Sequence, residues 1–316
     1  MDIVEIKSDD TYYSTRGNME DYCIGICPPS YSVPPWFYDT SSITGLVIEE
    51  GVISIGKFAF YGCSGLTSTS IVIPNSVKHI GGESFLNSNL TSVIIGNGVR
   101  TIGRRAFEDN SLISVVISGS VRAIGNCAFC GNNLPSVVIP NNVAYIGDMA
   151  FSDVDSIIAV PDNPNYCSVD GVLFNKDKTT LIQYPRNRKD TAYTVPKSVT
   201  YVGNYAFTAR DNLMSVTIPN SVELIGIGAF FRSDKLTSVT IGDSVTAIEY
   251  GVFSGCSSLI SVTILNPIPP FIAGVEEFVK ENWLEDAALY IPALSMNAYK
   301  RAPGWNRFKK ILPVKN

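Results

Sequence analysis

Two cysteines in this sequence have a spacing that could support chemistry. Cys127 and Cys130 form a Cys-x-x-Cys pair, the spacing of redox-active dithiols and of half of a zinc site. No second pair follows at zinc-finger spacing, and the intervening Ala128 and Phe129 belong to a dipeptide that recurs along the chain. We therefore interpret both cysteines as packing residues of a repeat.

The chain has seven cysteines, an odd number, so at least one of them is a thiol or pairs with another molecule. Cys23 and Cys27 lie four residues apart near the N-terminus. In an oxidising compartment they can form a disulfide, and in a reducing one they are buried thiols. The sequence leaves both states open.

Other reactive groups are scarce. His79 is the single histidine, so zinc chemistry that needs two or three histidines is excluded within one chain. Carboxylates occur in pairs at Glu49-Glu50, Glu276-Glu277 and Glu285-Asp286, which we interpret as solvated charge. No glycine-rich phosphate loop is present. We predict no catalytic, cofactor-binding or metal-binding residues, no cofactor, and a protein that is not an enzyme.

The balance of acidic and basic residues limits the classes of partner that this protein could bind. The chain carries 24 Lys+Arg against 29 Asp+Glu, a net charge of −5, and 45% of its residues are hydrophobic. A disordered chain or a polybasic nucleic-acid binder would have a different balance. The pair Arg104-Arg105 is followed by Glu108 and Asp109, which argues against a phosphate site. No apolar run is long enough to cross a membrane. We expect neither nucleic acid as a partner nor membrane insertion.

A repeat of 22–23 residues accounts for most of the chain. The phenylalanine of an Ala-Phe dipeptide, or of a degenerate copy, recurs at Phe60, Phe85, Phe107, Phe129, Phe151, Phe207, Phe230 and Phe253. A Leu-x-Ser-Val-x-Ile segment follows most copies, then a turn such as Pro140-Asn141-Asn142, then Val-x-x-Ile-Gly. This period lies in the leucine-rich-repeat range.

Each unit has a simple physical interpretation. Alternation in Ser-Val-x-Ile is the period of a strand, and its β-branched residues favour one. Proline ends the strand, and Asn or Ser closes the turn. The glycine after Ile predicts a tight bend, while Ala and Phe fill the space between coils. One unit cannot bury these residues alone, so stacked coils must form one long parallel sheet.

The pattern Cys-x-x-Leu-x-Ser-Val-x-Ile-Pro-x-Ser-Val-x-x-Ile-Gly-x-x-Ala-Phe resembles the BspA-like leucine-rich repeats of bacterial surface proteins. Cys63 and Cys256 keep the cysteine, and the remaining copies place Asn110, Asn132, Asp211 and Asp234 near that position. The resemblance covers roughly residues 44–316. It implies an α/β repeat solenoid, a right-handed leucine-rich-repeat superhelix that is rich in β-structure, has a parallel sheet on one face, and is capped at both ends.

Three segments are expected: an N-terminal cap at 1–43, repeats at 44–265 with an expanded, hairpin-containing repeat at 152–198, and a C-terminal cap at 266–316. The hairpin is predicted from two apolar runs around Asn175–Lys178. In the C-terminal cap, Ser295 is expected to cap a short helix. Trp305, Phe308, Ile311 and Leu312 are expected to close the last coil.

Residues between the inward-pointing Val and Ile of each strand face outward. We call them the outward stripe: Val72, Ile94, Val116, Val138, Thr217, Thr240 and Thr263. A row of serines lies beside it. An exposed apolar stripe can mark a protein-binding surface, whereas β-branched residues also simply suit a sheet. Both interpretations stay open.

The resemblance implies a non-enzymatic, adhesin-like bacterial protein, secreted or at the cell surface, whose partner is a host or neighbouring-cell protein bound by the sheet face. The alternatives are an intracellular structural or adaptor repeat protein and a carbohydrate-binding surface protein. The residues from Met1 to Glu5 lack the pattern of a signal peptide. Either a signal peptide was removed or the protein stays in the cytoplasm.

Overall fold

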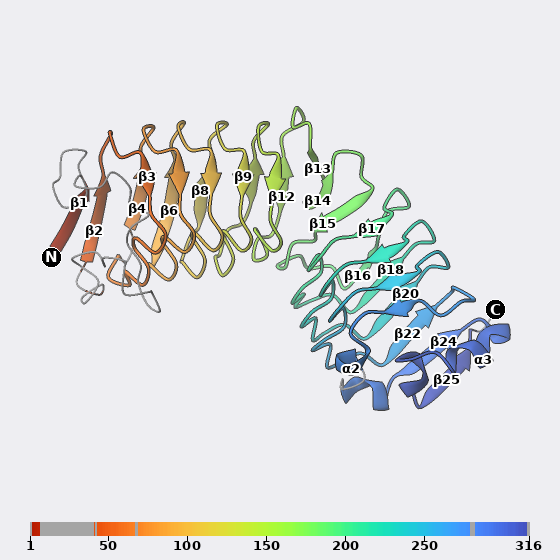
Figure 1. The fold of residues 1–316 in the computed structure, drawn as a ribbon. Coiled ribbons are helices and arrows are strands. Elements are labelled where there is room, and N and C mark those ends of the chain that lie inside the picture. The colour runs from red at the N-terminus through yellow and green to blue at the C-terminus, as the bar shows by residue number, and fades with distance from the viewer. Residues whose placement is uncertain (1, 7–40, 42, 67–68, 279–281, 315–316) are drawn as a thin grey trace. The chain divides into compact units, whose positions relative to one another are not determined.

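The computed structural model describes residues 2–6, 41, 43–66, 69–278 and 282–314. They form two compact units, unit 1 (Met1–Gly171) and unit 2 (Val172–Asn316), each a solenoid with parallel sheets and little helix (Figure 1). The boundary between them falls inside the expanded repeat at 152–198. Cys23 and Cys27 lie outside the described residues.

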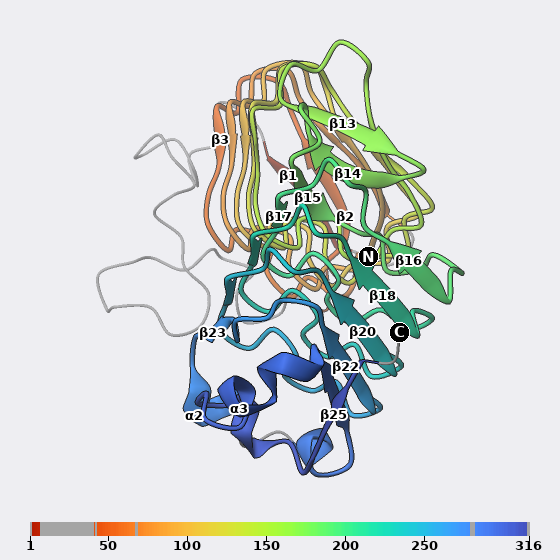
Figure 2. The same cartoon turned by 90° about the vertical axis from the view of Figure 1, so that its right-hand side faces the viewer.

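The longer strands of unit 1 come from the Leu-x-Ser-Val-x-Ile segments. They are β2 (Ile43–Ile48), β4 (Thr69–Ile73), β6 (Leu90–Ile95), β8 (Ser114–Val116), β10 (Val137–Ile139) and β12 (Ile157–Ala159). Another strand, β1 (Asp2–Ile6), pairs in parallel with β2, and β13 (Tyr166–Val169) follows β12. In Figure 2 the coils of unit 1 lie nearly behind one another, so equivalent residues of successive coils are neighbours.

The prediction of one long sheet is wrong in two respects, and the first is a gap. Strands β4, β6 and β8 form one sheet, and β10 and β12 form another. At the gap, Pro135 occupies the second position of its segment. The equivalent Ile113 donates its backbone N–H to the carbonyl oxygen of Thr91 in the coil before it, at 2.9 Å. Proline has no N–H to donate, so the ladder is interrupted there.

The second difference is an additional sheet. The Val-x-x-Ile-Gly segments form two-residue strands, which pair in parallel as a five-stranded sheet in unit 1. These are β3 (Ser54–Ile55), β5 (His79–Ile80), β7 (Thr101–Ile102), β9 (Ala123–Ile124) and β11 (Tyr145–Ile146). The following glycine allows the coils to approach closely, because a Cβ on Gly125 would lie 2.5 Å from the backbone nitrogen of Arg104.

Phenylalanines form the centre of each unit. In unit 1, the rings of Phe60, Phe85, Phe107, Phe129 and Phe151 stack with centroid distances of 5.0–5.5 Å, and each is fully buried. The Leu, Val and Ile residues predicted to point inward are buried around them, except Val115 on β8, which is half-buried. Each coil therefore depends on its neighbours for its core, as the repeat predicts.

A second buried column lies three residues after each phenylalanine, and in most coils its side chain is polar, whereas Val154 and the cysteines Cys63 and Cys256 occupy it in the others. Asn110 donates from Nδ2 to the carbonyl oxygens of Phe85 (2.7 Å) and Phe107 (3.1 Å). Its Oδ1 accepts the backbone N–H groups of Ser88 (3.1 Å) and Leu90 (3.0 Å). Asn110 thus joins two successive coils through groups that would otherwise be buried without partners.

The column differs from the prediction in unit 2. Arg210 and Ser233 occupy its buried positions, whereas Asp211 and Asp234 are exposed. A carboxylate has no hydrogen to donate to the carbonyl oxygens that face this position. Ser233 Oγ does donate, to the carbonyl oxygen of Phe207 at 2.7 Å. Asp211 instead pairs with Arg186 at 3.1 Å.

Unit 2 begins with the expected hairpin, in which β14 (Val172–Asn175) and β15 (Thr180–Gln183) are antiparallel. Asn175 closes it, because its Oδ1 accepts the backbone N–H of Thr180 at 2.8 Å. Two series of parallel strands follow. The longer ones are β16 (Ala192–Thr194), β18 (Ser215–Ile218), β20 (Ser238–Ile241), β22 (Ser261–Ile264), β24 (Ala288–Ile291) and β25 (Lys310–Pro313). The two-residue ones are β17 (Tyr201–Val202), β19 (Leu224–Ile225), β21 (Ala247–Ile248) and β23 (Phe271–Ile272).

Short helical turns accompany the last strands: α2 (Val275–Phe278), η3 (Asn282–Glu285), η4 (Ala293–Ser295), α3 (Met296–Tyr299) and η5 (Trp305–Arg307). Ser295 precedes α3, but its buried side chain makes no capping hydrogen bond, contrary to expectation. Trp305 and Phe308 are buried and stack on one another. Ile311 is half-buried, and Leu312 is 41% exposed.

Candidate binding surface

The two cysteines of the Cys-x-x-Cys pair and the single histidine lie in different surroundings. The Cys130 thiol is buried and donates to the carbonyl oxygen of Met149 at 2.9 Å, while Cys127 is half-buried. Neither forms a disulfide. His79 is exposed, and its Nδ1 lies 2.9 Å from Thr101 Oγ1. Within the described ranges, no three His, Cys, Asp or Glu side chains gather as metal ligands would.

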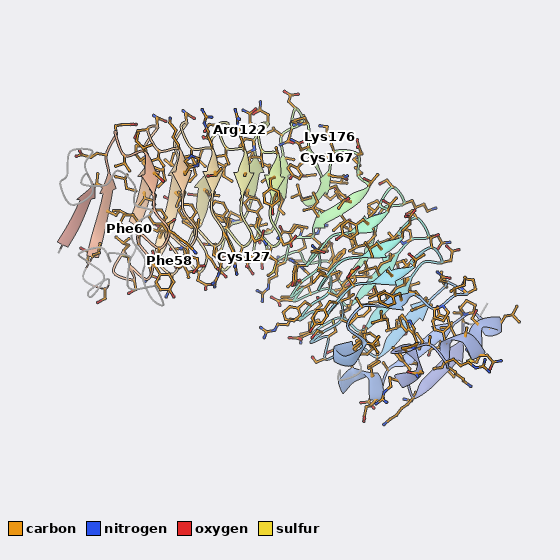
Figure 3. The ribbon with its side chains drawn as sticks, in the orientation of Figure 1. Phe58, Phe60, Arg122, Cys127, Cys167 and Lys176 are labelled. Atoms are coloured by element: carbon orange, nitrogen blue, oxygen red, sulfur yellow. The ribbon has the colours of Figure 1, made fainter. Side chains whose placement is uncertain are left out.

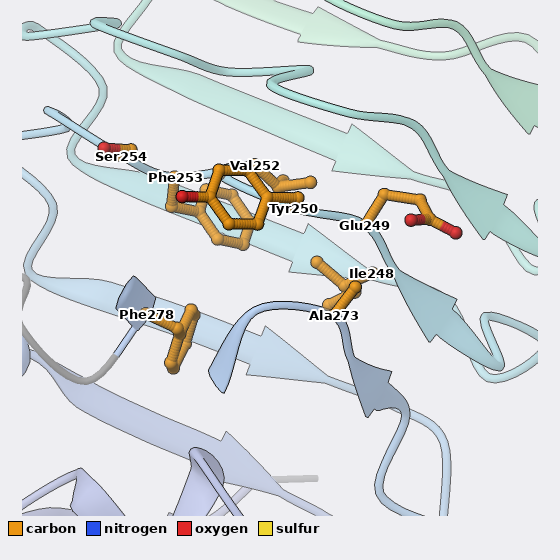
Figure 4. A pocket seen from close by; sticks show the side chains of 9 residues that line it. Ile248, Glu249, Tyr250, Val252, Phe253, Ser254, Ala273 and Phe278 are labelled. Carbon is orange, nitrogen blue, oxygen red and sulfur yellow. The ribbon is translucent and has the colours of Figure 1, made fainter. Parts of the chain in front are cut away.

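A small pocket lies in unit 2, between β21 and the α2 turn (Figure 4). Its volume is about 90 Å³, and Val252, Phe253, Ala273 and Phe278 give it apolar walls. Figure 4 shows the Glu249 side chain directed away from Phe278. Pockets for small-molecule ligands are several times larger, so this pocket does not provide a substrate site.

The aliphatic half of the outward stripe lies in unit 1 and is well exposed. Val72, Ile94, Val116 and Val138 are 56%, 44%, 56% and 48% exposed, respectively. Val72 is the register partner of Ile94, and Ile94 that of Val116. Adjacent paired strands are about 4.8 Å apart, so Val72, Ile94 and Val116 form a continuous column. Val138 lies on β10, beyond the gap that follows β8.

Two members of the column are missing from the predicted stripe. Val47 on β2 is 47% exposed, and Ile158 on β12 is 45% exposed. Ile158 is the register partner of Val138. Each sits one residue after an inward-pointing residue in a degenerate copy of the repeat, Leu46-Val47-Ile48 or Ile157-Ile158-Ala159. Alignment of these copies on the strand, rather than on Ala-Phe, would have found both.

The column borders an open depression of about 560 Å³. Val72, Ile94 and Val116 contribute apolar walls, and the turns that follow their strands contribute polar groups from Asn75 and Asn97. Those turns are held together, since Asn75 Oδ1 accepts the backbone N–H of Asn97 at 2.7 Å. An apolar surface with a polar edge is the usual composition of a protein-binding patch.

The remaining stripe residues lie in unit 2 and have hydroxyl groups. Thr217, Thr240 and Thr263 are register partners on β18, β20 and β22. Thr217 is exposed, whereas Thr240 and Thr263 are half-buried. The stripe thus has an aliphatic part in unit 1 and a threonine part in unit 2, and these two parts have different binding chemistry.

Comparison with known proteins identifies the repeat. Residues 34–158 and 186–272, more than half of the chain, match the model of the BspA type leucine rich repeat region in six copies. The chain belongs to this family. No curated protein gives a match to the sequence. Among the described residues, no helix is both long enough and apolar enough to cross a membrane.

Solved structures of bacterial leucine-rich-repeat proteins share the fold. A leucine-rich repeat protein from Eubacterium ventriosum has 23% identity and a TM-score of 0.70, over 89% of this chain and 75% of that one. A leucine rich cell surface protein from Faecalibacterium prausnitzii has 28% identity and a TM-score of 0.60, over 87% and 80%. The pneumococcal vaccine antigen PcpA has 20% identity and a TM-score of 0.54, over 84% and 85%.

Proposed function

We propose that this BspA-type protein is a non-enzymatic binding module that recognises another protein through the sheet face bearing the outward stripe. The supporting observation is the column of exposed aliphatic side chains beside the depression in unit 1. Each of these side chains would lose contact with water when a partner binds, which is favourable in proportion to the apolar area covered. The contacts are spread over several coils, as expected for a solenoid that binds an extended surface.

The proposal also places the protein at the bacterial surface or in the extracellular medium, with host or neighbouring-cell proteins as partners. The family match supports this location, together with the similarity to a leucine rich cell surface protein. The threonine part of the stripe in unit 2 is proposed as a second, more polar contact region.

The test uses a panel of purified extracellular-matrix and cell-surface proteins, with binding measured by surface plasmon resonance. We expect at least one to bind the wild-type chain. The double variant Val116→Ser, Val138→Ser should weaken that binding at least about tenfold, because two aliphatic side chains lose about 1.5–3 kcal/mol of burial in total.

The matched control is Ile260→Ser, Ile268→Ser, which removes two exposed aliphatic side chains of unit 2, 60% and 73% exposed. Its affinity should stay within about twofold of wild type. Unchanged binding by the stripe variant, with a normal melting temperature, would exclude the stripe as the binding surface. Binding to no member of the panel would favour an intracellular adaptor, and binding to glycans alone would favour a carbohydrate-binding protein.

A further inference from the structure

A column of basic side chains lies beside the five-stranded sheet of unit 1. Lys78, Arg100 and Arg122 each immediately precede a two-residue strand, in three consecutive coils. Arg100 donates its backbone N–H to the carbonyl oxygen of Lys78, and Arg122 donates to that of Arg100, both at 2.8 Å. We call these three residues the basic ladder.

The ladder is open to solvent. Arg100 and Arg122 are exposed, and Lys78 is half-buried. Figure 3 shows Arg122 at the edge of unit 1 opposite Cys127, with its side chain directed outward. Hydrogen-bonded neighbours in successive coils place the backbones of these three residues about one strand spacing apart, about 4.8 Å.

Acidic side chains do not neutralise the ladder. Within the described part of the chain, no carboxylate forms an ion pair with any of the three cations. The Glu50 carboxylate interacts with Lys78 at longer range. The pKa of Glu50 is lowered chiefly by the hydrogen bond from the backbone N–H of Asn75, and to a smaller extent by the charge of Lys78. Like charges on adjacent rungs of a sheet repel one another, so the ladder destabilises the unit that contains it.

The repeat itself does not require these cations. The equivalent positions of unit 2 are Thr200, Glu223 and Thr246, whose backbone N–H groups make the same coil-to-coil bonds. In unit 1, Ile53 and Ala144 occupy this position in the coils before and after the ladder. The basic residues therefore form a local feature in a chain whose net charge is −5.

We propose that the basic ladder binds a linear polysaccharide that carries sulfate or carboxylate groups. One strand spacing is close to the length of one sugar residue in an extended chain, so successive anionic sugars can meet successive cations. Beside the ladder, His79 and Thr101 offer hydrogen-bonding groups on the outward face. Tyr145, 55% exposed and hydrogen-bonded through its backbone to Arg122, offers a ring face for a sugar.

A polysaccharide fits these groups better than a nucleic acid does. Single-stranded nucleic acids are held by several aromatic side chains along a basic groove, and Tyr145 is the one aromatic residue among the two-residue strands of this sheet. The site lies on a different sheet from the outward stripe, so the inference is independent of the proposed function.

The test measures binding of the full chain to two probes by isothermal titration calorimetry, at about 0.1 M salt, where surface charges act over about 10 Å. The probes are a heparin oligosaccharide, which carries sulfates and carboxylates, and a hyaluronan oligosaccharide, which carries only carboxylates. The triple variant Lys78→Gln, Arg100→Gln, Arg122→Gln should bind heparin at least about tenfold more weakly than wild type. Its affinity should also depend less steeply on salt, because fewer ions are released on binding.

The matched control is Lys197→Gln, Arg232→Gln, Lys235→Gln, which removes three exposed cations of unit 2 and changes the net charge equally. It should bind within about twofold of wild type. If the ladder variant binds both probes more weakly, the site is supported and carboxylates are sufficient for binding. If only heparin binding is weakened, the site is supported and sulfate groups are required. No binding of either probe by the wild type, an equal loss in the control, or tighter binding of single-stranded DNA through the same residues would overturn the proposal.

Discussion

At the scale of single residues, the polar column shows how one side chain can connect neighbouring coils. A solenoid coil leaves backbone carbonyl and N–H groups facing its interior, and these groups must find partners there. Asn110 and Asn132 satisfy both kinds, because an amide side chain donates and accepts. Ser88 and Ser233 only donate to a carbonyl oxygen, at 2.5 Å and 2.7 Å.

Asn110→Ala should therefore be among the most destabilising polar substitutions in unit 1. It leaves the N–H groups of Ser88 and Leu90 without the Asn110 oxygen, and we expect a loss of about 2–4 kcal/mol in the free energy of unfolding. Urea denaturation followed by circular dichroism measures this loss. Asn97→Ala, at an exposed turn, is the control and should change stability by less than about 0.5 kcal/mol. Equal effects of the two substitutions would contradict the role of the column.

The thiols should differ in reactivity. The neighbouring Cys130 thiol and nearby arginines lower the pKa of Cys127, whereas burial raises the pKa of Cys63 to about 12. Because the thiolate is the nucleophile, iodoacetamide at about pH 8 should alkylate the half-buried Cys127 well before the buried Cys63. Peptide mass spectrometry at timed quenches measures both rates. Faster alkylation of Cys63 in the folded protein would refute this order.

At the scale of elements, the repeat predicts what fills each coil better than how the coils pair. The inward-pointing residues, the turns and the hairpin closed by Asn175 follow from hydrophobic period and turn chemistry, and the structure contains all three. The gap between β8 and β10 depends on a single missing N–H at Pro135, a residue that the strand pattern tolerates. The second sheet was missed because two-residue strands are too short to show a period of two.

The same reason hid the basic ladder. Lys78, Arg100 and Arg122 recur at intervals of 22 residues in Val-Lys-His-Ile, Val-Arg-Thr-Ile and Val-Arg-Ala-Ile. In the sequence these three residues are separated and look like isolated surface charges. They become neighbours only when their segments pair as strands. The outward stripe was found because its strands are long enough to show which side chains face out.

The loop between β15 and β16 holds a charged cluster that should make stability depend on pH. Asp190 accepts hydrogen bonds from Arg188 Nε (2.6 Å) and Tyr184 Oη (2.8 Å). The bond from Arg188, and then that from Tyr184, lowers the pKa of Asp190 below its ordinary value of 3.8. A carboxyl whose pKa is lowered by folding stabilises the protein fully above its ordinary pKa, and this contribution is lost as the pH falls through the folded-state value.

Asp190→Asn should lower the free energy of unfolding at pH 7 by about 1 kcal/mol or less, since the carboxylate is 40% exposed and screened by solvent. The difference from wild type should shrink toward zero as the pH falls below the ordinary pKa of 3.8 and through the lowered folded-state pKa, where Asp190 itself becomes neutral. Urea denaturation at several pH values measures this difference. Asp211→Asn, whose pair with Arg186 is more exposed, is the control and should have a smaller effect. A difference that stays constant down to pH 2 would show that the charge of Asp190 is not involved.

At the scale of the molecule, repetition explains both the low charge and the columns of like side chains. The charged fraction is 17% because the repeat uses Ser, Thr, Asn and Gly on its outer positions. Side chains at equivalent positions lie on neighbouring coils, so a repeat naturally builds columns of one chemistry: phenylalanine, asparagine, serine, aliphatic or basic. Columns favour binding of extended partners, whereas catalysis needs different groups that converge on one point.

In such an architecture, a substitution in one coil should reduce stability mainly near that coil. Each coil of unit 1 contacts mainly the coils beside it, so a defect should weaken its neighbours most and distant coils least. Phe107 stacks on Phe85 at 5.1 Å and on Phe129 at 5.3 Å, and Phe107→Leu should cost about 1–2 kcal/mol. Amide hydrogen exchange should show the greatest loss of protection in the coils of Phe85, Phe107 and Phe129, decreasing toward β3 and β12. The control Phe58→Leu, at a half-buried ring, should change exchange far less. A uniform loss across unit 1 would mean instead that its coils unfold as one cooperative block.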